Sequence, residues 1–578
     1  MDSERAARVT DVFLSATPAR GRMPDGAEVV VRTLEAHDVE HVFGVCGDTS
    51  IGLYRTLAEL DHGLEHVLAR DERGAAYMAD AYARLSGKPG ICEAPSGGGA
   101  TYLVPGLAES DDSAVPVVGL NTTIPVRYRG RGVLTELDQR ALFDTVTTWN
   151  ASVDHPDLVS RMLRQAFREA TTGRPGATHL SFPMDVLDGE TSERVYGEEA
   201  TSHYPAYRPP PDPAAVEHAA AVLEGSDRPV IVAGGGVHSS QAWQEVRDLA
   251  EHVGVPVAQT LTSAGCVGDS PYDLGVVGEN GSREYANEVV HEADALFLLG
   301  TAVESVWTYK WSSPPDGETT IVHADIDPGS IGKNYETDVA LPGDLRETVR
   351  ALLDRVPAGE KWDAADLAAR HRAWREPYEA AAASEAFPLR PERMVAGASE
   401  VLEDDAVIVS DPGTSCPYFA ALYPFSRPGR HWVTPRAHGA LGYTIPAVVG
   451  AHYARPESQV VGFTGDGSFG TSAGDLETIA RLDLPVTVVI VNNAAFSWIE
   501  AGQRSFADFS FGVDFDGLDY AAVAEAFGLT GFRVEAADEY EAVLRAAVEL
   551  DGPAVVDLPT LPLPGLEGTP VDWLEPED

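Results

Sequence analysis

Two loops that follow strand-like apolar runs in the last third of the chain place the strongest constraint on its fold. The run Gln459–Thr464 ends in Gly465-Asp466-Gly467, a helical pattern near Ser472–Leu482 follows, and the next run, Leu484–Val491, ends in Asn492-Asn493. This order predicts a β-α-β unit, in which a right-handed crossover sets two parallel strands side by side. Asp466 and Asn493 are therefore expected to meet, although 27 positions separate them (493 − 466).

A carboxylate and an amide oxygen at such a sheet edge suit a hard divalent cation. Mg²⁺ takes oxygen ligands in octahedral geometry and commonly shares them with phosphate groups. Parallel α/β sheets bind ligands at the carboxyl ends of their strands, and glycines there let the main chain approach a phosphate. A plain turn and a strand cap would use the same residues, but the strand, helix, strand order favours a site for magnesium and a diphosphate.

Strand-like runs alternate with helical patterns in two earlier parts of the chain as well. The first part contains Glu40–Val45 and Val115–Asn121, and the second opens with Arg228–Gly236. This alternation is typical of parallel α/β sheets, and the 578 residues exceed the roughly 250–300 that one core organises. We predict an α/β fold of three doubly wound parallel-sheet domains. The predicted order is an N-terminal tail (1–25), a first domain (26–190), a proline-rich linker on the surface (191–215), a Rossmann-like central domain (216–356), a helical linker (357–390), a third domain (391–560) and an acidic tail (561–578).

The charge of the chain restricts its partners. Ninety Asp and Glu residues against 42 Lys and Arg give a net charge of −48, which repels nucleic acid and anionic membranes. The carboxylates are spread along the whole chain, as in proteins of salt-loving organisms, where screening weakens self-repulsion. The four cysteines form no CxxC pair, and neither a secretory signal nor a membrane span is recognisable. We expect a cytoplasmic protein that contacts neither nucleic acid nor membrane.

The segment GDGSFGTSAGDLETIARLDLPVTVVIVNN resembles the thiamine-diphosphate signature of the acetolactate synthase and benzoylformate decarboxylase superfamily. The resemblance implies Mg²⁺ ligands from Asp466, from Asn493 and from the backbone oxygen of Ala495. The segment HVLARDERGAAYMADAYARLSGKPG resembles the part of the family around its essential glutamate, here Glu72. That carboxyl group is implied to bond N1′ of the cofactor's aminopyrimidine, a role that burial and a raised pKa assist. Alone, a glutamate at a helix start more often stabilises the helix dipole.

Further glycine loops match the family in the same order. The resemblance implies that the first domain binds the pyrimidine and the third binds the diphosphate. It also implies that Leu441 is an apolar wedge that holds the two cofactor rings in a V. The alternative is that Leu441 is an ordinary leucine of the hydrophobic core. The implied cofactor-binding residues are Gly47, Glu72, Pro95, Gly97, Gly413, Thr414, Ser415, Gly439, Leu441, Gly465, Asp466, Gly467, Ser468, Asn493, Ala495, Phe496 and Ser497.

The family builds each active centre across two subunits, so the resemblance implies a homodimer or a homotetramer. The central part of the chain is similar to a family domain that binds FAD in some relatives. Residues 300–304, Gly-Thr-Ala-Val-Glu, lack the arginines of the flavin motif. We therefore do not expect FAD, and interpret Gly234–Gly236 as a turn.

The resemblance implies a carboligase or lyase that acts on 2-oxo acids in the manner of acetolactate synthase. A pyruvate-type substrate would be decarboxylated and the resulting enamine added to a second carbonyl. One alternative is a non-oxidative decarboxylase of the benzoylformate decarboxylase type, because Met184 and Gly502 stand where acetolactate synthases carry Lys and Trp. A second is a non-catalytic scaffold, against which Glu72, Asp466 and Asn493 are all present. Within a predicted lid, Ala494–Phe506, the residues Phe496, Ser497, Trp498 and Gln503 could contact substrate or form an amphipathic surface helix.

Overall fold

The computed structural model contains three sheets, each of six strands, and describes residues 23–315, 317–563 and 569–570. Every pair of neighbouring strands within these sheets is parallel. The predicted α/β fold with three parallel-sheet domains is therefore confirmed. Most of the two predicted tails, 1–25 and 561–578, lies outside the described residues, and the exact domain boundaries remain predictions.

The first sheet has the strand order β2-β1-β3-β4-β6-β5. Its strands are β1 (His41–Gly44), β2 (Glu65–Leu68), β3 (Gly90–Ala94), β4 (Val117–Thr123), β5 (Trp149–Ser152) and β6 (Ala177–Pro183). The α-helices around it are α2 (Gly26–Ala36), α3 (Ile51–Glu59), α4 (Glu72–Ser86), α5 (Gly98–Asp112), α6 (Gln139–Phe143), α7 (Val159–Thr171) and α8 (Met184–Leu187).

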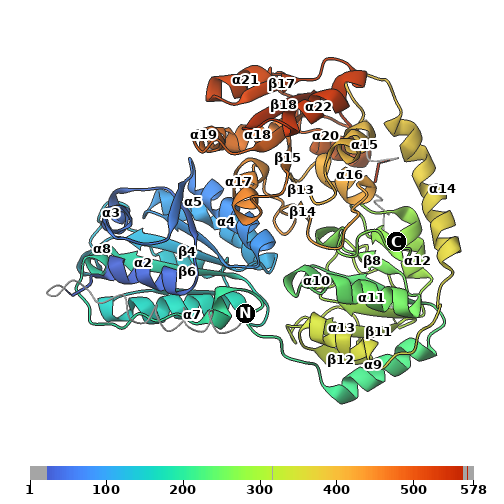
Figure 1. Ribbon diagram of the computed structural model, residues 1–578, viewed down its shortest axis with the longest axis horizontal. Helices are drawn as coiled ribbons and strands as arrows, with labels where there is room; N and C mark the ends of the chain where they lie inside the picture. The colour runs from blue at the N-terminus through green and yellow to red at the C-terminus, as the bar shows by residue number, and fades with distance from the viewer. Residues whose placement is uncertain (1–22, 316, 564–568, 571–578) are drawn as a thin grey trace, which may run out of the picture.

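The central sheet has the order β12-β11-β10-β7-β8-β9. Its strands are β7 (Pro229–Ala233), β8 (Val257–Gln259), β9 (Asp273–Val276), β10 (Ala295–Leu299), β11 (Thr320–Asp325) and β12 (Val339–Pro342). Its α-helices are α9 (Pro213–Gly225), α10 (Gly236–Ser239), α11 (Trp243–Val253), α12 (Glu284–His291) and α13 (Leu345–Leu353). The long helix α14 (Ala364–Ala382) then runs along this domain to the third one (Figure 1).

The third sheet, β14-β13-β15-β16-β18-β17, repeats the strand order of the first when each is numbered from its own first strand. Its strands are β13 (Val407–Ser410), β14 (Trp432–Val433), β15 (Val460–Gly465), β16 (Val486–Asn492), β17 (Thr530–Arg533) and β18 (Ala554–Pro559). Its α-helices are α15 (Pro391–Val401), α16 (Ser415–Leu422), α17 (Thr444–Ala454), α18 (Asp466–Ser472), α19 (Leu476–Arg481), α20 (Ser497–Ala507), α21 (Tyr520–Phe527) and α22 (Tyr540–Val548).

The first and third domains share one hydrophobic core, which α4 and α17 form between them. Glycines allow the backbones to come close: a methyl group added at Gly450 of α17 would lie 2.0 Å from the carbonyl oxygen of Met78. The same is true within the first domain, where a methyl group at Gly106 of α5 would lie 2.3 Å from Cβ of Ala76. Helix α4, which begins at Glu72, is thus held rigidly on two sides.

Two local predictions differ from the structure. The helix after the Gly-Asp-Gly loop was expected near Ser472, but α18 already begins at Asp466, and a 3₁₀ turn at Ala473–Asp475 separates it from α19. The Asp466 side chain accepts a hydrogen bond from the backbone N–H of Gly467 at 2.9 Å, which satisfies a donor of the first helical turn. In the linker that was expected to lie on the surface, Tyr204 is buried and donates to the carbonyl oxygen of Ala83.

Among the described residues, none of the helices combines the length and the apolar character needed to cross a bilayer.

Candidate active site

The ends of β15 and β16 bring Asp466 and the Asn493 segment together. The two strands are parallel neighbours, with Gly465 opposite Val491. The Asp466 carboxylate accepts hydrogen bonds from the backbone N–H groups of Asn493 at 2.9 Å and Ala494 at 2.6 Å. Burial raises the pKa of Asp466 to about 6, while the hydrogen bonds from Ala494 and Asn493 oppose that rise.

The amide oxygen of Asn493 is buried and has no hydrogen-bond partner among the described residues. Ala494 adopts a left-handed backbone conformation, with φ of 56°, which redirects the chain after β16, and Ala495 behind it is buried. A buried acceptor without a donor is costly, and a cation would satisfy it. No cluster of three or more His, Cys, Asp or Glu residues able to hold a metal occurs in the described part of the chain. A metal here would therefore rely on one carboxylate and neutral oxygens.

A cavity of about 320 Å³ opens at this edge of the third sheet. A methyl group added at Gly413, Gly439 or Gly465 would meet no atom within 4 Å, so these glycines border open space. Thirteen predicted cofactor-binding residues line the cavity, namely Gly413, Thr414, Ser415, Gly439, Leu441, Gly465, Asp466, Gly467, Ser468, Asn493, Ala495, Phe496 and Ser497. The other lining residues are Pro412, Arg436, Val491, Trp498 and Ile499. Space beside glycines and a buried acceptor fit a diphosphate with its metal.

Two buried carboxylates fix the loop that carries Leu441. Asp411 accepts hydrogen bonds from the backbone N–H groups of Gly442 at 3.0 Å and Tyr443 at 2.9 Å. Glu109 of the first domain accepts from the N–H groups of Ala437 at 3.2 Å and His438 at 2.9 Å. The wall of the cavity formed by residues 436–443 is therefore anchored to both domains.

The predicted first-domain residues form a separate group. A methyl group added at Gly47 would lie 2.5 Å from Pro95, and one added at Gly99 would lie 2.8 Å from Oε1 of Glu72. Glu72 is half-buried, and burial raises the pKa of its carboxyl group. The cavity at Asp466 is not lined by any of the predicted first-domain residues Gly47, Glu72, Pro95 and Gly97. A single chain therefore carries both groups of predicted cofactor residues, but the two groups do not line a common cavity.

Of the predicted lid residues, Phe496, Ser497 and Trp498 line the cavity. Gln503 lies farther along α20, where its side chain accepts from the backbone N–H of Phe511 at 2.9 Å and does not line the cavity. The prediction that Gln503 contacts substrate therefore finds no support in this chain's geometry.

Sequence reasoning did not single out Glu93, which ends up buried near Glu72. Tyr54 donates a hydrogen bond to Oε2 of Glu93 at 2.8 Å, whereas Oε1 is buried without a partner among the described residues. Burial raises the pKa of Glu93 to about 8, against the hydrogen bonds from Tyr54 and Ser50. No signal in the sequence marks it, because its environment comes from segments far apart along the chain.

The raised pKa of Glu93 predicts a pH-dependent stability. The pKa of an unfolded glutamate is near 4.5 and that of the folded Glu93 is about 8. Its contribution to the free energy of unfolding is therefore complete below pH 4.5 and is lost as the pH rises from 4.5 through 8. Between these two pH values the loss amounts to about 1.4 kcal/mol per pH unit. Replacing Glu93 by Gln should flatten the fall of Tm between pH 5 and pH 9, measured by calorimetry. The exposed control Glu59→Gln should keep the wild-type slope, and an equally steep fall in Glu93→Gln would contradict the assignment.

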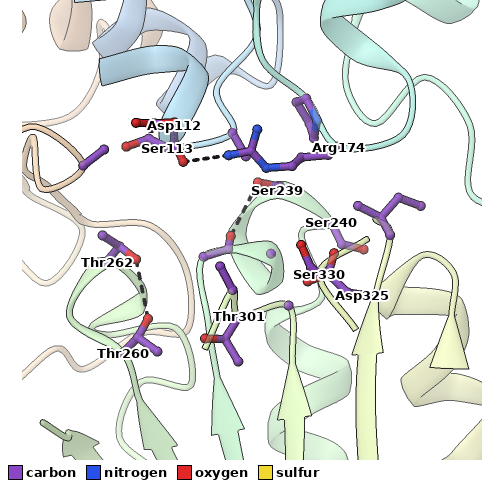
Figure 2. Close-up of a pocket in the computed structure, with 18 of the residues that line it drawn as sticks. Asp112, Ser113, Arg174, Ser239, Ser240, Thr260, Thr262, Thr301, Asp325 and Ser330 are labelled. Carbon is purple, nitrogen blue, oxygen red and sulfur yellow. Dashed lines mark hydrogen bonds between the residues drawn. The ribbon is translucent and has the colours of Figure 1, made fainter. Parts of the chain in front are cut away.

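A second and larger cavity, of about 480 Å³, lies where the carboxyl ends of the central strands face the first domain. Figure 2 shows Asp112, Ser113 and Arg174 on one side and Ser239, Thr301 and Asp325 on the other. Gly234 and Gly236 act here in backbone packing, because a methyl group at Gly234 would lie 2.3 Å from the carbonyl oxygen of Gly300. The cavity lacks the aspartate and asparagine pair, so its size alone does not make it the active site.

Known protein families match three parts of the chain. Residues 24–142 match the N-terminal TPP binding domain of thiamine pyrophosphate enzymes, residues 216–352 the central domain and residues 411–558 the C-terminal TPP binding domain. A "Probable acetolactate synthase large subunit" of Methanocaldococcus jannaschii is 34% identical, over 94% of this chain and 93% of that protein. An "Acetolactate synthase" of Mycobacterium leprae is 32% identical, over 92% and 86% respectively. The "Acetolactate synthase isozyme 1 large subunit" of Escherichia coli is 30% identical, over 94% and 95%.

Proposed function

The chain belongs to the thiamine pyrophosphate enzyme family as an acetolactate synthase-like member, and from that premise we propose that it joins two 2-oxo acids with release of CO₂. In this reaction the bond between C1 and C2 of the donor breaks, and its electron pair forms a new bond to C2 of the acceptor. The acceptor's carbonyl oxygen takes up a proton, and its carboxylate remains in the product. When bound, thiamine diphosphate supplies the electron sink that makes the loss of CO₂ possible.

The observation that carries the proposal is the unpaired Asn493 oxygen beside the buried Asp466 carboxylate. We propose that both, with the backbone oxygen of Ala495, hold a Mg²⁺ ion. The glycine-bordered cavity beside these residues would accommodate a diphosphate, a group whose oxygens Mg²⁺ commonly binds. Leu441 would support the cofactor from the loop that Glu109 and Asp411 anchor.

Glu72 would hold and release the proton at N1′ of the aminopyrimidine. Burial raises the pKa of Glu72, which supports this role because a partly desolvated carboxyl group gives up its proton less readily to water. Gly47, Pro95 and Gly97 would form the surrounding pyrimidine site.

We further propose that the active centre forms between two subunits of a homodimer or homotetramer. The separation of Glu72 from the cavity at Asp466 supports this, since neither group is complete alone. Exposed apolar side chains occur beside both groups: Ile51 and Tyr102 follow the first-domain loops, and Phe496 and Ile499 line the cavity. Such side chains favour burial against a second copy of the chain.

The charge of −48 supports a cytoplasm rich in salt as the working environment. Purified protein should therefore be assayed in molar KCl with Mg²⁺, thiamine diphosphate and a panel of 2-oxo acids, without added flavin. We expect a 2-hydroxy-3-oxo acid such as acetolactate together with CO₂. Aldehyde as the sole product would instead identify a decarboxylase, and no consumption of any 2-oxo acid would refute the proposal.

A further inference from the structure

Arg436 occupies a position that its sequence context did not reveal. Its side chain lines both the cavity at Asp466 and the larger cavity of the central domain. It is half-buried, and in the part of the chain that the structure describes it has no hydrogen bond and no ion pair. By contrast, two other arginines that line the larger cavity are bonded: Arg84 pairs with Asp80, and Arg174 donates to the carbonyl oxygen of Asp112.

The backbone beside Arg436 is held in place. The two following residues, Ala437 and His438, donate their N–H groups to the buried Glu109 carboxylate. The Arg436 side chain therefore extends from an ordered backbone, so that binding of an anion costs no backbone entropy at this position.

No carboxylate of the described residues forms an ion pair with Arg436. Burial raises the pKa of Glu304, and the charge of Arg436 opposes that rise by favouring the ionised form, but the two side chains do not pair. A guanidinium group in a cavity wall, without a protein partner, is suited to bind a carboxylate or phosphate in bidentate fashion. No described residue of this chain supplies that anion, which leaves the guanidinium group open to one from a ligand.

On the basis of the proposed function, we infer that Arg436 binds the carboxylate of the acceptor 2-oxo acid and thereby directs the enzyme toward carbon–carbon bond formation. The donor's carboxylate leaves as neutral CO₂, so pairing it with a cation would stabilise the ground state more than the transition state. The acceptor keeps its carboxylate from binding to product. Pairing that group positions its carbonyl carbon without opposing the reaction.

The experiment compares wild type with Arg436→Gln, using pyruvate as donor and either a second 2-oxo acid or acetaldehyde as acceptor. We expect the KM for the 2-oxo acid acceptor to rise about 10- to 100-fold, the range for a lost charged hydrogen bond. Formation of acetoin from the neutral acetaldehyde should stay within about twofold of wild type, because that acceptor has no carboxylate to lose. Arg436→Lys should recover part of the loss. The Arg174→Gln variant, which changes the larger cavity alone, should behave as wild type.

Cofactor binding is measured separately, by titrating thiamine diphosphate in Mg²⁺ and following the intrinsic tryptophan fluorescence, to which Trp498 in the wall of the same cavity contributes. An unchanged Kd in Arg436→Gln supports the inference. A Kd that rises as much as the acceptor KM would mean that Arg436 binds the diphosphate, and an equal loss with acetaldehyde would mean that it serves the donor; either result overturns the inference. Wild-type protein that consumes no 2-oxo acid would instead refute the proposed function.

Discussion

Replacing Glu72 by glutamine is expected to reduce turnover by about 10²- to 10⁴-fold, the usual contribution of a positioned proton-transfer group. Glutamine keeps the size and the hydrogen-bonding capacity of the side chain but cannot give up and regain a proton. Glu72 stands in the first turn of α4, next to Gly99 and Pro95, and does not line the Asp466 cavity, so its replacement leaves that cavity intact. The Kd for thiamine diphosphate in Mg²⁺, measured by calorimetric titration, should therefore change by less than about tenfold.

The matched control is Glu28→Gln. Glu28 also stands in the first turn of a helix, α2, but away from the cofactor residues. If Glu72 only stabilised its helix dipole, both variants would lose about 0.3–1 kcal/mol of stability and little activity. Near-wild-type turnover of Glu72→Gln would therefore remove the glutamate from the proposed mechanism.

The fold was predictable because its signals are local and repeated. The buried strand β16 (Val486–Asn492) is mostly apolar, with Thr487 as its one polar residue before the terminal asparagine, as expected for a parallel strand covered on both faces. The helix boundary at Asp466 was missed for an equally local reason. A Gly-Asp-Gly sequence is typical of a turn, and here the turn is also the first turn of α18, because Asp466 satisfies its free backbone donors.

The cavity at Asp466 was predictable because the spacing of residues along the chain determines which strand ends lie together. The Asp466 and Asn493 pair follows directly from the right-handed crossover, and the glycines around it leave space beside the backbone. Arg436 and Glu93 were not predictable, since their properties depend on tertiary neighbours. Arg436 borders two cavities because residues of the first, central and third domains together line the larger one, and Glu93 is buried by residues from several segments.

The second large effect is expected for Asp466→Asn. Among the described residues that line the cavity, Asp466 is the only carboxylate. Its replacement removes the anionic ligand and should weaken Mg²⁺ binding by at least about a hundredfold, or about 2.7 kcal/mol. Turnover at 1 mM Mg²⁺ should be lost, and part of it should return at much higher Mg²⁺. The control Asp557→Asn changes another buried aspartate, on strand β18, which accepts a hydrogen bond from Asn492 and does not line the cavity. It should lower Tm but preserve the Mg²⁺ requirement.

Mixing the two inactive variants tests where the active centre forms. If Glu72 of one subunit meets Asp466 of another, a hybrid of Glu72→Gln and Asp466→Asn subunits contains one centre with both changes and one with neither. Random exchange makes half of the dimers hybrids, so about a quarter of wild-type activity should return. If each chain instead built a complete centre by itself, every centre in the mixture would carry one of the two changes. Mixing would then restore nothing, and the separation of Glu72 from the Asp466 cavity would need another explanation.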